Sequence, residues 1–499
     1  MFLNRSQVLE ALHSGFAGRR VLVVGDLMLD RYLWGEVSRI SPEAPVPVVR
    51  VMRETDNGGG AANVALNLAS LGLHTILVGW TGADAEGHRL RELLQQAGID
   101  TRGIQAEPGR PTITKTRIIG GHQQMLRLDR EETRAVDSHT LTLCLARARR
   151  CLRQRIVPHA LVLSDYGKGM LTEEVCQSLI QAARLAGIPV LVDPKGMDYR
   201  KYRGATAITP NRRELTEAVA AQEQTMIPGD DLNRLLTAGE RLRSTLAVEL
   251  LAVTLSEQGI ALLAAEQSPR RIPAMAREVY DVSGAGDTVI GTLTAGLAAG
   301  LAPMDALHLA NLAAGVVVGK VGTTPVARVE LLAAISSQEH LEQSDKVVEL
   351  DEAVHRVAQW RQRGEPIVFT NGCFDLLHAG HVTYLERARQ LGRRLVVGLN
   401  TDRSVRALKG PTRPIIHETD RARVLAAMAA VDLVVLFDEA TPLTLIRALQ
   451  PDILAKGADY SEDQVVGGAE VKGWGGRVAL VPLVAGRSSS RIVERIQGG

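Results

Sequence analysis

The sequence predicts an α/β protein made of two successive domains, and three observations support this fold class. Short apolar strands alternate with helical segments along most of the chain, a pattern typical of mostly parallel sheets with helices on both faces. A polar stretch at residues 336–350 interrupts this alternation and predicts a linker. Each flanking part carries its own glycine-containing motif between a strand and a helix. We therefore expect one domain at residues 1–335 and another at residues 351–499.

The first part opens with a buried-type strand and then alternates with helices. Strands are expected at residues 21–25, 75–79, 160–163, 189–192, 207–208 and 251–255, and helices at residues 62–71 and 87–97. The segment Thr112–Asp129 differs, because its residues alternate like an antiparallel pair with a turn at Gly120–Gly121. We expect this pair to form a small β-ribbon that projects from the main sheet as a lid over a site.

The second part repeats the alternation over about 150 residues, which is the size of one typical domain. Its strands are expected at residues 366–370, 395–399, 433–437, 453–455 and 478–481, and its helices at residues 379–391 and 489–496. The two parts carry different motifs, so they are not copies of one repeat.

Composition excludes several classes of protein. The chain has 499 residues and a net charge of +2, so its charge gives no sign of nucleic-acid binding. No stretch approaches the roughly 20 apolar residues that cross a bilayer, and the first residues lack the apolar run of a signal peptide. The four cysteines form no CxxC pair, which favours free thiols in a reducing compartment. We expect a cytoplasmic protein in which Cys144 and Cys151 share the buried face of one helix.

The strongest motif of the first part is Asp281–Asp287 (DVSGAGD), which precedes a helical run. Its glycines allow a tight turn and the close approach of a phosphate, and a helix start offers unpaired N–H groups to an anion. These features predict an anion hole at Gly284, Ala285 and Gly286. Asp287 is placed to act as the general base of a phosphoryl transfer, although the motif alone also fits a capped helix start.

Other polar groups of the first part fit a sugar phosphate. Asn57–Asn63 (NGGGAAN) brings three glycines and two amides to the start of a helix. Asp30 follows the first strand, at the ligand-binding end of an open α/β sheet. The ribbon carries Lys115, Arg117 and Arg127, which fit either a clamp on a substrate phosphate or a solvated face.

The second part carries the motif Thr370–His381 (TNGCFDLLHAGH), which follows a strand and opens a helix. Nucleotidyl transfer needs preorganised donors around the α-phosphate and the leaving pyrophosphate rather than a covalent catalyst. His378 and His381 would supply them, and Gly380 lets a phosphate approach the backbone. The competing hypotheses are two core or capping histidines, and zinc held by both histidines and Cys373, although a structural zinc site requires four ligands.

Together the first-part motifs resemble those of the ribokinase-like (pfkB) sugar kinases, over most of residues 15–325. The resemblance implies that Asp287 is the catalytic base and that residues 284–286 form the anion hole. The sugar contacts that it implies are Asp30, Gly59, Gly60 and Asn63, to which the ribbon adds Lys115 and Arg117. The residues expected near ATP are Asn211, Arg212, Arg213, Glu214, Thr254, Ser256 and Gly259, with Glu214 near magnesium and residues 306–319 bordering adenine.

The second motif resembles that of the HxGH cytidylyltransferase-like nucleotidyltransferases, over roughly residues 365–499. The resemblance implies that His378 and His381 stabilise the transferring phosphate. Further nucleotide contacts are expected at Asn400, Asp402, Lys409, Lys456, Ser488 and Ser489.

The order of the two parts resembles the bifunctional heptose-7-phosphate kinase and heptose-1-phosphate adenylyltransferase family of lipopolysaccharide inner-core synthesis. The resemblance implies ATP and heptose phosphates as substrates, Mg²⁺ with ATP, a K⁺ requirement, and a homodimer. Three alternatives stay open from the residues: another sugar kinase fused to a glycerol-phosphate-type cytidylyltransferase, a nucleotide sensor without catalysis, and one active domain joined to a scaffold.

Overall fold

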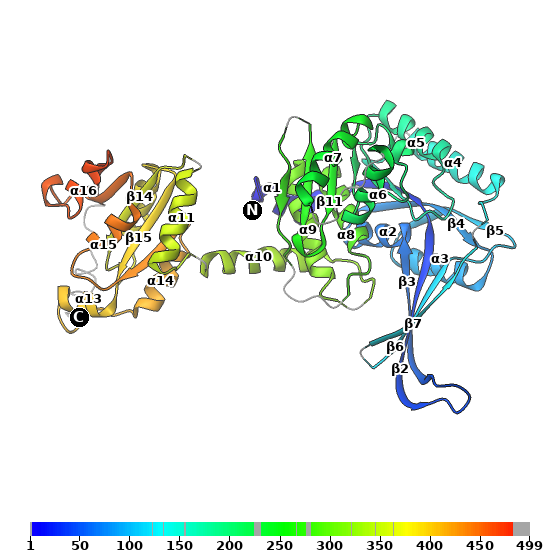
Figure 1. Cartoon of the computed structure of the whole chain (residues 1–499), viewed down its shortest axis with the longest axis horizontal. Helices are drawn as coiled ribbons and strands as arrows, with labels where there is room; N and C mark the ends of the chain where they lie inside the picture. Colours follow the sequence, from blue (N-terminus) through cyan, green and yellow to red (C-terminus); the bar gives the residue numbers. More distant parts are fainter. Residues whose placement is uncertain are drawn as a thin grey trace. The chain divides into compact units, whose positions relative to one another are not determined.

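The structure is a computed structural model, and the parts of the chain that it describes form two compact units divided between Ile335 and Ser336. It does not describe residues 1, 122, 133, 154–155, 224–230, 266, 276–280, 321, 345, 363 and 483–499. The expected helix at residues 489–496 therefore lies outside the described residues. Each unit is an α/β fold, which confirms the predicted fold class (Figure 1).

The first unit is built on a nine-stranded sheet that is parallel except at one edge, where β12 and β13 run antiparallel. In spatial order the strands are β13 (Arg270–Ile272), β12 (Ile260–Ala264), β11 (Leu250–Thr254), β10 (Ala207–Ile208), β9 (Val190–Asp193), β8 (Ala160–Ser164), β1 (Arg20–Gly25), β4 (His74–Gly82) and β5 (Asp100–Glu107). In β1, Val21 and Val23 face one core while Leu22 and Val24 face the other. The sheet is thus covered on both faces, as its apolar strands predict.

Helices cover the two faces in separate groups. One core takes residues from α1 (Arg5–Glu10), α2 (Ala61–Ser70), α3 (Ala85–Gln96), α8 (Ala285–Ala298), α9 (Pro303–Val317) and α10 (Arg328–Ser344). The other takes residues from α4 (Ser138–Leu152), α5 (Glu173–Leu185), α6 (Arg212–Glu223) and α7 (Leu232–Thr245). Cys144 and Cys151 are both buried on α4, as expected, and all four cysteines are free thiols. Short helical turns add η1 (Ala11–Gly15), η2 (Tyr199–Tyr202) and η3 (Ser256–Gln258).

A second sheet projects from the body of the first unit (Figure 1). Its order is β3 (Pro47–Gly60), β2 (Leu27–Ile40), β6 (Thr114–Gly120) and β7 (Gln123–Arg130). The expected antiparallel ribbon is present as β6 and β7, but it is not isolated, because the longer hairpin β2–β3 pairs with it through β2. Asp30 follows the first strand, as predicted, and lies within β2, while Asn57–Gly60 is the end of β3.

The start of the chain is fixed on a late helix of the first unit. The backbone N–H groups of Leu3 and Asn4 donate to the carboxylate of Asp305, over 2.6 and 3.0 Å. Asp305 is fully buried at the start of α9. A carboxylate in the first turn of a helix is also favoured by the helix dipole, which stabilises this attachment.

The second unit is built on a five-stranded parallel sheet. In spatial order the strands are β16 (Leu433–Phe437), β15 (Arg394–Asn400), β14 (Ile367–Gly372), β17 (Ile453–Gly457) and β18 (Arg477–Val481). One core takes residues from α12 (Ala379–Gln390) and α14 (Glu418–Ala426), and the other from α11 (Leu350–Gln362), α15 (Leu443–Leu449) and α16 (Gly468–Gly473). The unit also has α13 (Asp402–Lys409) and η4 (Glu462–Gln464).

Residues 336–350, predicted as a linker, are largely regular. The helix α10 runs on to Ser344, because residues 336–344 contain neither glycine nor proline and are mostly good helix formers. Val348 then donates its backbone N–H to the carbonyl of Val434 over 3.0 Å, so the end of the predicted linker is part of the second unit. Among the helices of the described residues, none is long and apolar enough to cross a membrane.

Candidate active sites

The predicted anion hole lies at the start of α8, a 14-residue helix. Gly284 is the residue before the helix and has a φ of 79°, a left-handed conformation that glycine adopts without strain. A Cβ atom there would lie 2.6 Å from Nδ2 of Asn63. A Cβ on Gly286 would meet no atom within 4 Å, so the first turn of the helix borders open space. Ala285 donates its backbone N–H to the carbonyl of Val282 over 3.2 Å. The open space beside this helix start nevertheless suits a phosphate.

Asp287 lies in that first turn and is only 4% exposed. Asn63 Nδ2 donates to one of its carboxylate oxygens and the Tyr166 hydroxyl to the other, each over 2.8 Å. Burial raises the pKa of Asp287 to about 7, against the effect of these two hydrogen bonds. A carboxyl group with a pKa near neutrality is suited to accept a proton at physiological pH.

Sequence reasoning missed Tyr166, which lies after β8. The signal was present as Asp165-Tyr-Gly-Lys168 at the carboxyl end of a parallel strand, the edge where such sheets hold their ligands.

The expected sugar contacts surround Asp287. Asp30 is buried, and its carboxylate pairs with Arg117 of β6 over 2.7 Å. A Cβ atom on Gly59 would lie 2.4 Å from Asp30 Oδ2, so glycine is required for this close approach. The ammonium of Lys115 lies 5.6 Å from the centre of the Tyr166 ring, and burial lowers its pKa.

Other residues of this region are placed differently. Gly60, the last residue of β3, has a φ of 59°, and a Cβ there would lie 3.4 Å from the Tyr166 ring. Arg127 pairs instead with Asp129 over 2.9 Å on the exposed side of β7.

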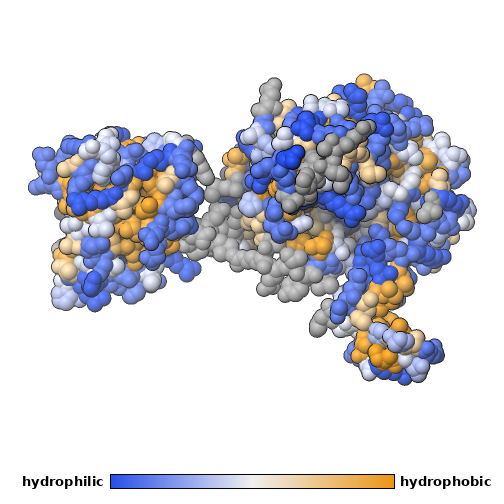
Figure 2. Space-filling view, viewed as in Figure 1, coloured by the Kyte–Doolittle hydropathy of each residue, from blue (hydrophilic) through white to orange (hydrophobic). Residues whose placement is uncertain are grey.

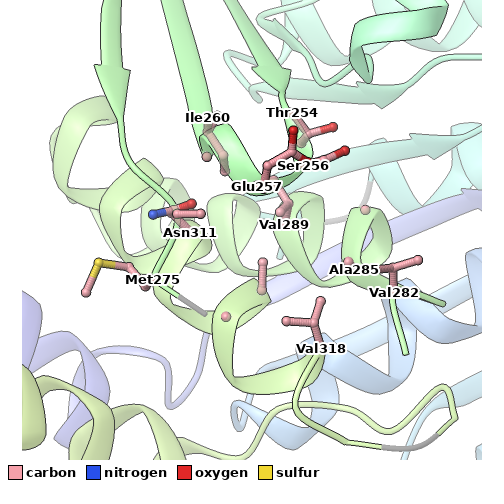
Figure 3. Close-up of a pocket in the computed structure, with 15 residues that line it drawn as sticks. Thr254, Ser256, Glu257, Ile260, Met275, Val282, Ala285, Val289, Asn311 and Val318 are labelled. Carbon is pink, nitrogen blue, oxygen red and sulfur yellow. The ribbon is translucent and has the colours of Figure 1, made fainter. Parts of the chain in front are cut away.

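A cavity of about 440 Å³ adjoins the anion hole (Figure 3). Figure 3 shows Thr254 and Ser256 on one side of it and Val318 on the opposite side, with Ala285 at one end. Three of the residues expected near ATP line this cavity, namely Thr254, Ser256 and Gly259. The region expected to border adenine also contributes to the lining, through Asn311, Ala314, Gly315 and Val318. A mostly apolar cavity that ends at an anion hole fits a nucleoside joined to phosphates.

The remaining ATP candidates lie at the start of α6. Asn211 accepts the backbone N–H of Glu214 over 2.9 Å, while Glu214 accepts the backbone N–H of Asn211 and pairs with Lys195. Arg213 forms an exposed ion pair with Glu217, four residues further along the helix, and Arg212 begins the helix. These contacts form a helix cap, and they leave the nucleotide role of Asn211, Arg212 and Arg213 a prediction.

Magnesium fits this region through its carboxylates. Burial, together with the charges of Asp287 and Glu214, raises the pKa of Asp193 well above its usual range. Adjacent acidic groups of this kind favour a nearby cation. Mg²⁺ is usually held by one or two carboxylates, by waters and by substrate phosphates, so the chain does not need a complete cage of its own ligands.

In the second unit, His378 and His381 lie at the start of α12. Their rings are stacked with centres 4.0 Å apart, and His378 Nδ1 accepts the backbone N–H of Gly380. Burial and the nearby His378 and Lys409 lower the pKa of His381 to about 4. The described residues contain no group of three or more His, Cys, Asp or Glu side chains arranged to hold a metal ion, so zinc on Cys373 and both histidines receives no support.

The other predicted nucleotide residues follow the strands at this edge of the sheet. Asn400 ends β15 and donates to Ser404, while Lys409 ends α13. Lys456, on β17, donates to the carbonyl of Asn371 over 3.3 Å, and burial lowers its pKa to about 8. Ser488 and Ser489 lie outside the described residues.

Arg421, missed by sequence reasoning, connects these segments. Its guanidinium is fully buried and donates to the carbonyls of Cys373, Asn400 and Ile416 over 2.7 to 2.9 Å. It also pairs with Asp402 over 2.6 Å, so the predicted nucleotide residue Asp402 is held by an ion pair. One side chain thus fixes the ends of β14 and β15 and the start of α14.

Comparisons with known proteins match two separate parts of the chain to two different family models. Residues 19–329 match the pfkB family carbohydrate kinase model, and residues 369–495 match the cytidylyltransferase-like model. The chain is 62% identical to bifunctional protein HldE of Magnetococcus marinus, over 98% of this chain and 99% of that protein. It is 58% identical to bifunctional protein HldE of Methylobacillus flagellatus, over 97% of both.

Solved structures give the fold of the first unit. The crystal structure of phosphofructokinase-2 from Escherichia coli with substrates and products matches with a TM-score of 0.53 and 18% identity, over 64% of this chain and 99% of that chain. The tetrameric inhibited form of that enzyme matches with a TM-score of 0.52 at the same identity, over 64% of this chain and 98% of that one.

Proposed function

Because the chain belongs to the HldE family of bifunctional proteins and combines a pfkB-family carbohydrate kinase with a cytidylyltransferase-like domain, we infer that each unit catalyses one transfer from ATP. The first unit phosphorylates D-glycero-D-manno-heptose 7-phosphate at C1. The second transfers AMP to heptose 1-phosphate and releases pyrophosphate. The product, ADP-heptose, is the precursor for the inner core of lipopolysaccharide. Both reactions use cytoplasmic ATP.

The observation that carries the kinase assignment is the buried Asp287 beside the start of α8. Asp287 accepts the proton of the C1 hydroxyl as its oxygen attacks the γ-phosphorus of ATP. The bond from that phosphorus to the bridging oxygen breaks, and ADP leaves. We assign stabilisation of the charge on the transferring group to the N–H groups at Gly284, Ala285 and Gly286, since they lie at a helix start. The Ala285 N–H would exchange its bond to the carbonyl of Val282 for one to the phosphate. Asp30 and Asn63 orient the sugar, with the backbone of Gly59 and Gly60.

The second reaction needs no general base, because the attacking group is already a phosphate anion. An oxygen of heptose 1-phosphate attacks the α-phosphorus of ATP, and the bond to the bridging oxygen of pyrophosphate breaks. We assign stabilisation of the transferring phosphate to His378 and His381, and neutralisation of phosphate charge to Lys409 and Lys456. Mg²⁺ bound with ATP supplies further charge neutralisation in both reactions.

Two substitutions test whether the sites act separately. We expect Asp287→Asn to abolish the kinase reaction and spare adenylyl transfer, and His381→Ala to do the reverse. Loss of both activities from either change would contradict two independent sites. If a variant keeps both activities, the role assigned to the replaced residue is contradicted. If the unsubstituted chain itself shows only one of the two activities, the other unit would instead have a scaffold role.

The identity of the sugar is tested by phosphorus NMR. The complete chain with magnesium-ATP and D-glycero-D-manno-heptose 7-phosphate should give an anomeric phosphate signal, and ADP-heptose after a 7-phosphatase is added. Lys115 and Arg117 support a phosphorylated sugar, since both are basic groups close to the buried Asp30. Turnover with another sugar phosphate, or with CTP in place of ATP, would instead favour the sugar kinase fused to a glycerol-phosphate-type cytidylyltransferase.

A potassium requirement of the kinase is a further part of the proposal. Asp281 accepts the backbone N–H groups of Ser283 and Gly322 and so joins the anion-hole loop to the loop after α9. A cation bound between these loops would order the anion hole. Equal kinase rates in potassium chloride and in tetramethylammonium chloride would contradict the potassium requirement.

We also propose that the projecting sheet forms a homodimer with a second copy. Figure 2 shows apolar residues gathered on this sheet. The sheet carries four apolar side chains that are each more than half exposed, namely Val51, Met52, Leu126 and Leu128. An exposed apolar patch of this kind is unusual in a monomer and typical of an interface. Light scattering should give a dimer that Leu128→Glu weakens, whereas Leu185→Glu, which changes the exposed Leu185 of α5, should not. A monomer at micromolar concentration would contradict the proposal.

A further inference from the structure

The carboxylate of Asp287 is held by two donors of different kinds. Asn63 donates from the first turn of α2, and Tyr166 donates from the loop that follows β8. The charged and titratable groups that face Asp287 from the surrounding elements are Asp30 of β2, Lys115 of β6, Tyr166 itself and Asp193 of β9. Within the described residues, Tyr166 is thus the titratable side chain that hydrogen-bonds directly to Asp287.

The backbone that carries Tyr166 is fixed by a buried carboxylate. Asp26 is fully buried at the end of β1, and it accepts the backbone N–H groups of Tyr166, Lys168 and Met170 over 2.9, 3.0 and 3.1 Å. Three such bonds place the loop in one conformation. The ammonium of Lys115 also lies over the ring of Tyr166, at 5.6 Å from its centre. The phenol hydroxyl therefore has little freedom to leave Asp287.

A hydroxyl that donates to a carboxylate stabilises the ionised form of that carboxylate. Burial and the negative charge of Asp30 act in the opposite direction, and the pKa of Asp287 is raised to about 7 as a result. Only the ionised form accepts a proton from the sugar hydroxyl. The hydrogen bond from Tyr166, together with that from Asn63, therefore increases the fraction of Asp287 that is ionised near neutral pH.

We propose that Tyr166 is a positioning residue of the kinase reaction: its hydroxyl orients the Asp287 carboxylate and favours the ionised form that accepts the sugar proton. Tyr166 keeps its own proton throughout, and the proton of the sugar hydroxyl goes to a remaining lone pair of Asp287. This role rests on the proposed role of Asp287 as the base.

The test is the pH dependence of kcat/KM for the kinase reaction in the complete Tyr166→Phe chain, since this quantity reports the ionisation of the free enzyme. We expect the acid limb to move up by about one pH unit when one hydrogen bond to the charged form is removed. From a pKa of about 7, this shift lowers kcat/KM by about 8-fold at pH 6.5 and by only about 1.1-fold at pH 9. Adenylyl transfer should not change.

Tyr202→Phe is the matched control. The Tyr202 hydroxyl donates to another buried carboxylate, that of Asp165, over 2.7 Å, and does not contact Asp287. We expect this variant to leave the acid limb in place. A loss of kcat/KM in Tyr166→Phe that is equal at pH 6.5 and pH 9, or no loss at either pH, would overturn the positioning role. Kinase activity of Asp287→Asn equal to that of the unsubstituted chain would instead overturn the underlying base assignment.

Discussion

Replacing Arg421 by methionine should destabilise the second unit severely while the first unit stays intact. The substitution removes the guanidinium that pairs with the buried Asp402 carboxylate over 2.6 Å and leaves that carboxylate, among the described residues, only His417, at 3.3 Å. It also removes the donor to the carbonyls of Cys373, Asn400 and Ile416. Breaking a buried ion pair by deleting one partner costs about 3–5 kcal/mol. Since a domain is stable by about 5–15 kcal/mol, we expect a folded but weakened unit.

Hydrogen exchange resolved by peptide measures this loss in the complete chain. A destabilisation of about 4 kcal/mol should speed exchange through global unfolding in β14 and β15 by roughly 10³-fold. Peptides from β1 and β8 report the first unit and should not change. Arg423→Met is the matched control, because Arg423 lies on the same helix and is exposed, and such changes usually cost less than about 0.5 kcal/mol. Equal exchange in the two variants would refute the assigned role of Arg421.

Three further predictions, which use four substitutions, have separate expected outcomes. Gly284→Ala should lower the unfolding temperature of the first unit in calorimetry, because an L-residue there is strained and its Cβ would lie 2.6 Å from Nδ2 of Asn63. Gly286→Ala should leave that unfolding temperature unchanged but raise the KM for ATP. His381 has a pKa lowered to about 4, so it binds fewer protons when folded. Urea unfolding should therefore show the second unit losing stability as pH falls from 6.5 toward 4, and His381→Asn should reduce this loss. Pyrophosphate release should decline as pH rises through the Lys456 pKa of about 8, and Lys456→Met should be slow at every pH.

Elements that are buried on both faces could be predicted from the sequence. The strands β1, β8 and β15 are apolar at almost every position, and β-strands of this kind occur in parallel sheets covered by helices. The hairpin β2–β3 was missed, because the outer parts of both strands are exposed and so carry no clear alternation of apolar and polar residues. Its conformation depends on the pairing of β2 with β6, and β6 begins at Thr114, well after the hairpin ends at Gly60.

Site residues that lie in local motifs could also be predicted from the sequence, while those that act through distant partners could not. Asp287 and His381 lie in local motifs whose glycines allow a phosphate to approach the backbone closely. The sequence therefore indicates these two residues directly. Tyr166 and Arg421 act through partners 121 and 48 residues away. The segment Asp165–Lys168 indicates a ligand-binding edge of the sheet, but no local pattern identifies these two partners. The sequence thus predicts the groups proposed to touch phosphate, while the side chains that hold them in place appear only when the chain is folded.

The attachment of Leu3 and Asn4 to Asp305 imposes an order on folding during translation. These partners are about 300 residues apart in the chain. At roughly 5–20 residues added per second, the ribosome needs about 15–60 s between them, and the starting segment must wait undocked for that time. The central strands can pair earlier, but the first unit closes only once α9 has left the exit tunnel. The second unit, which is made afterwards from one continuous segment, has no such delay.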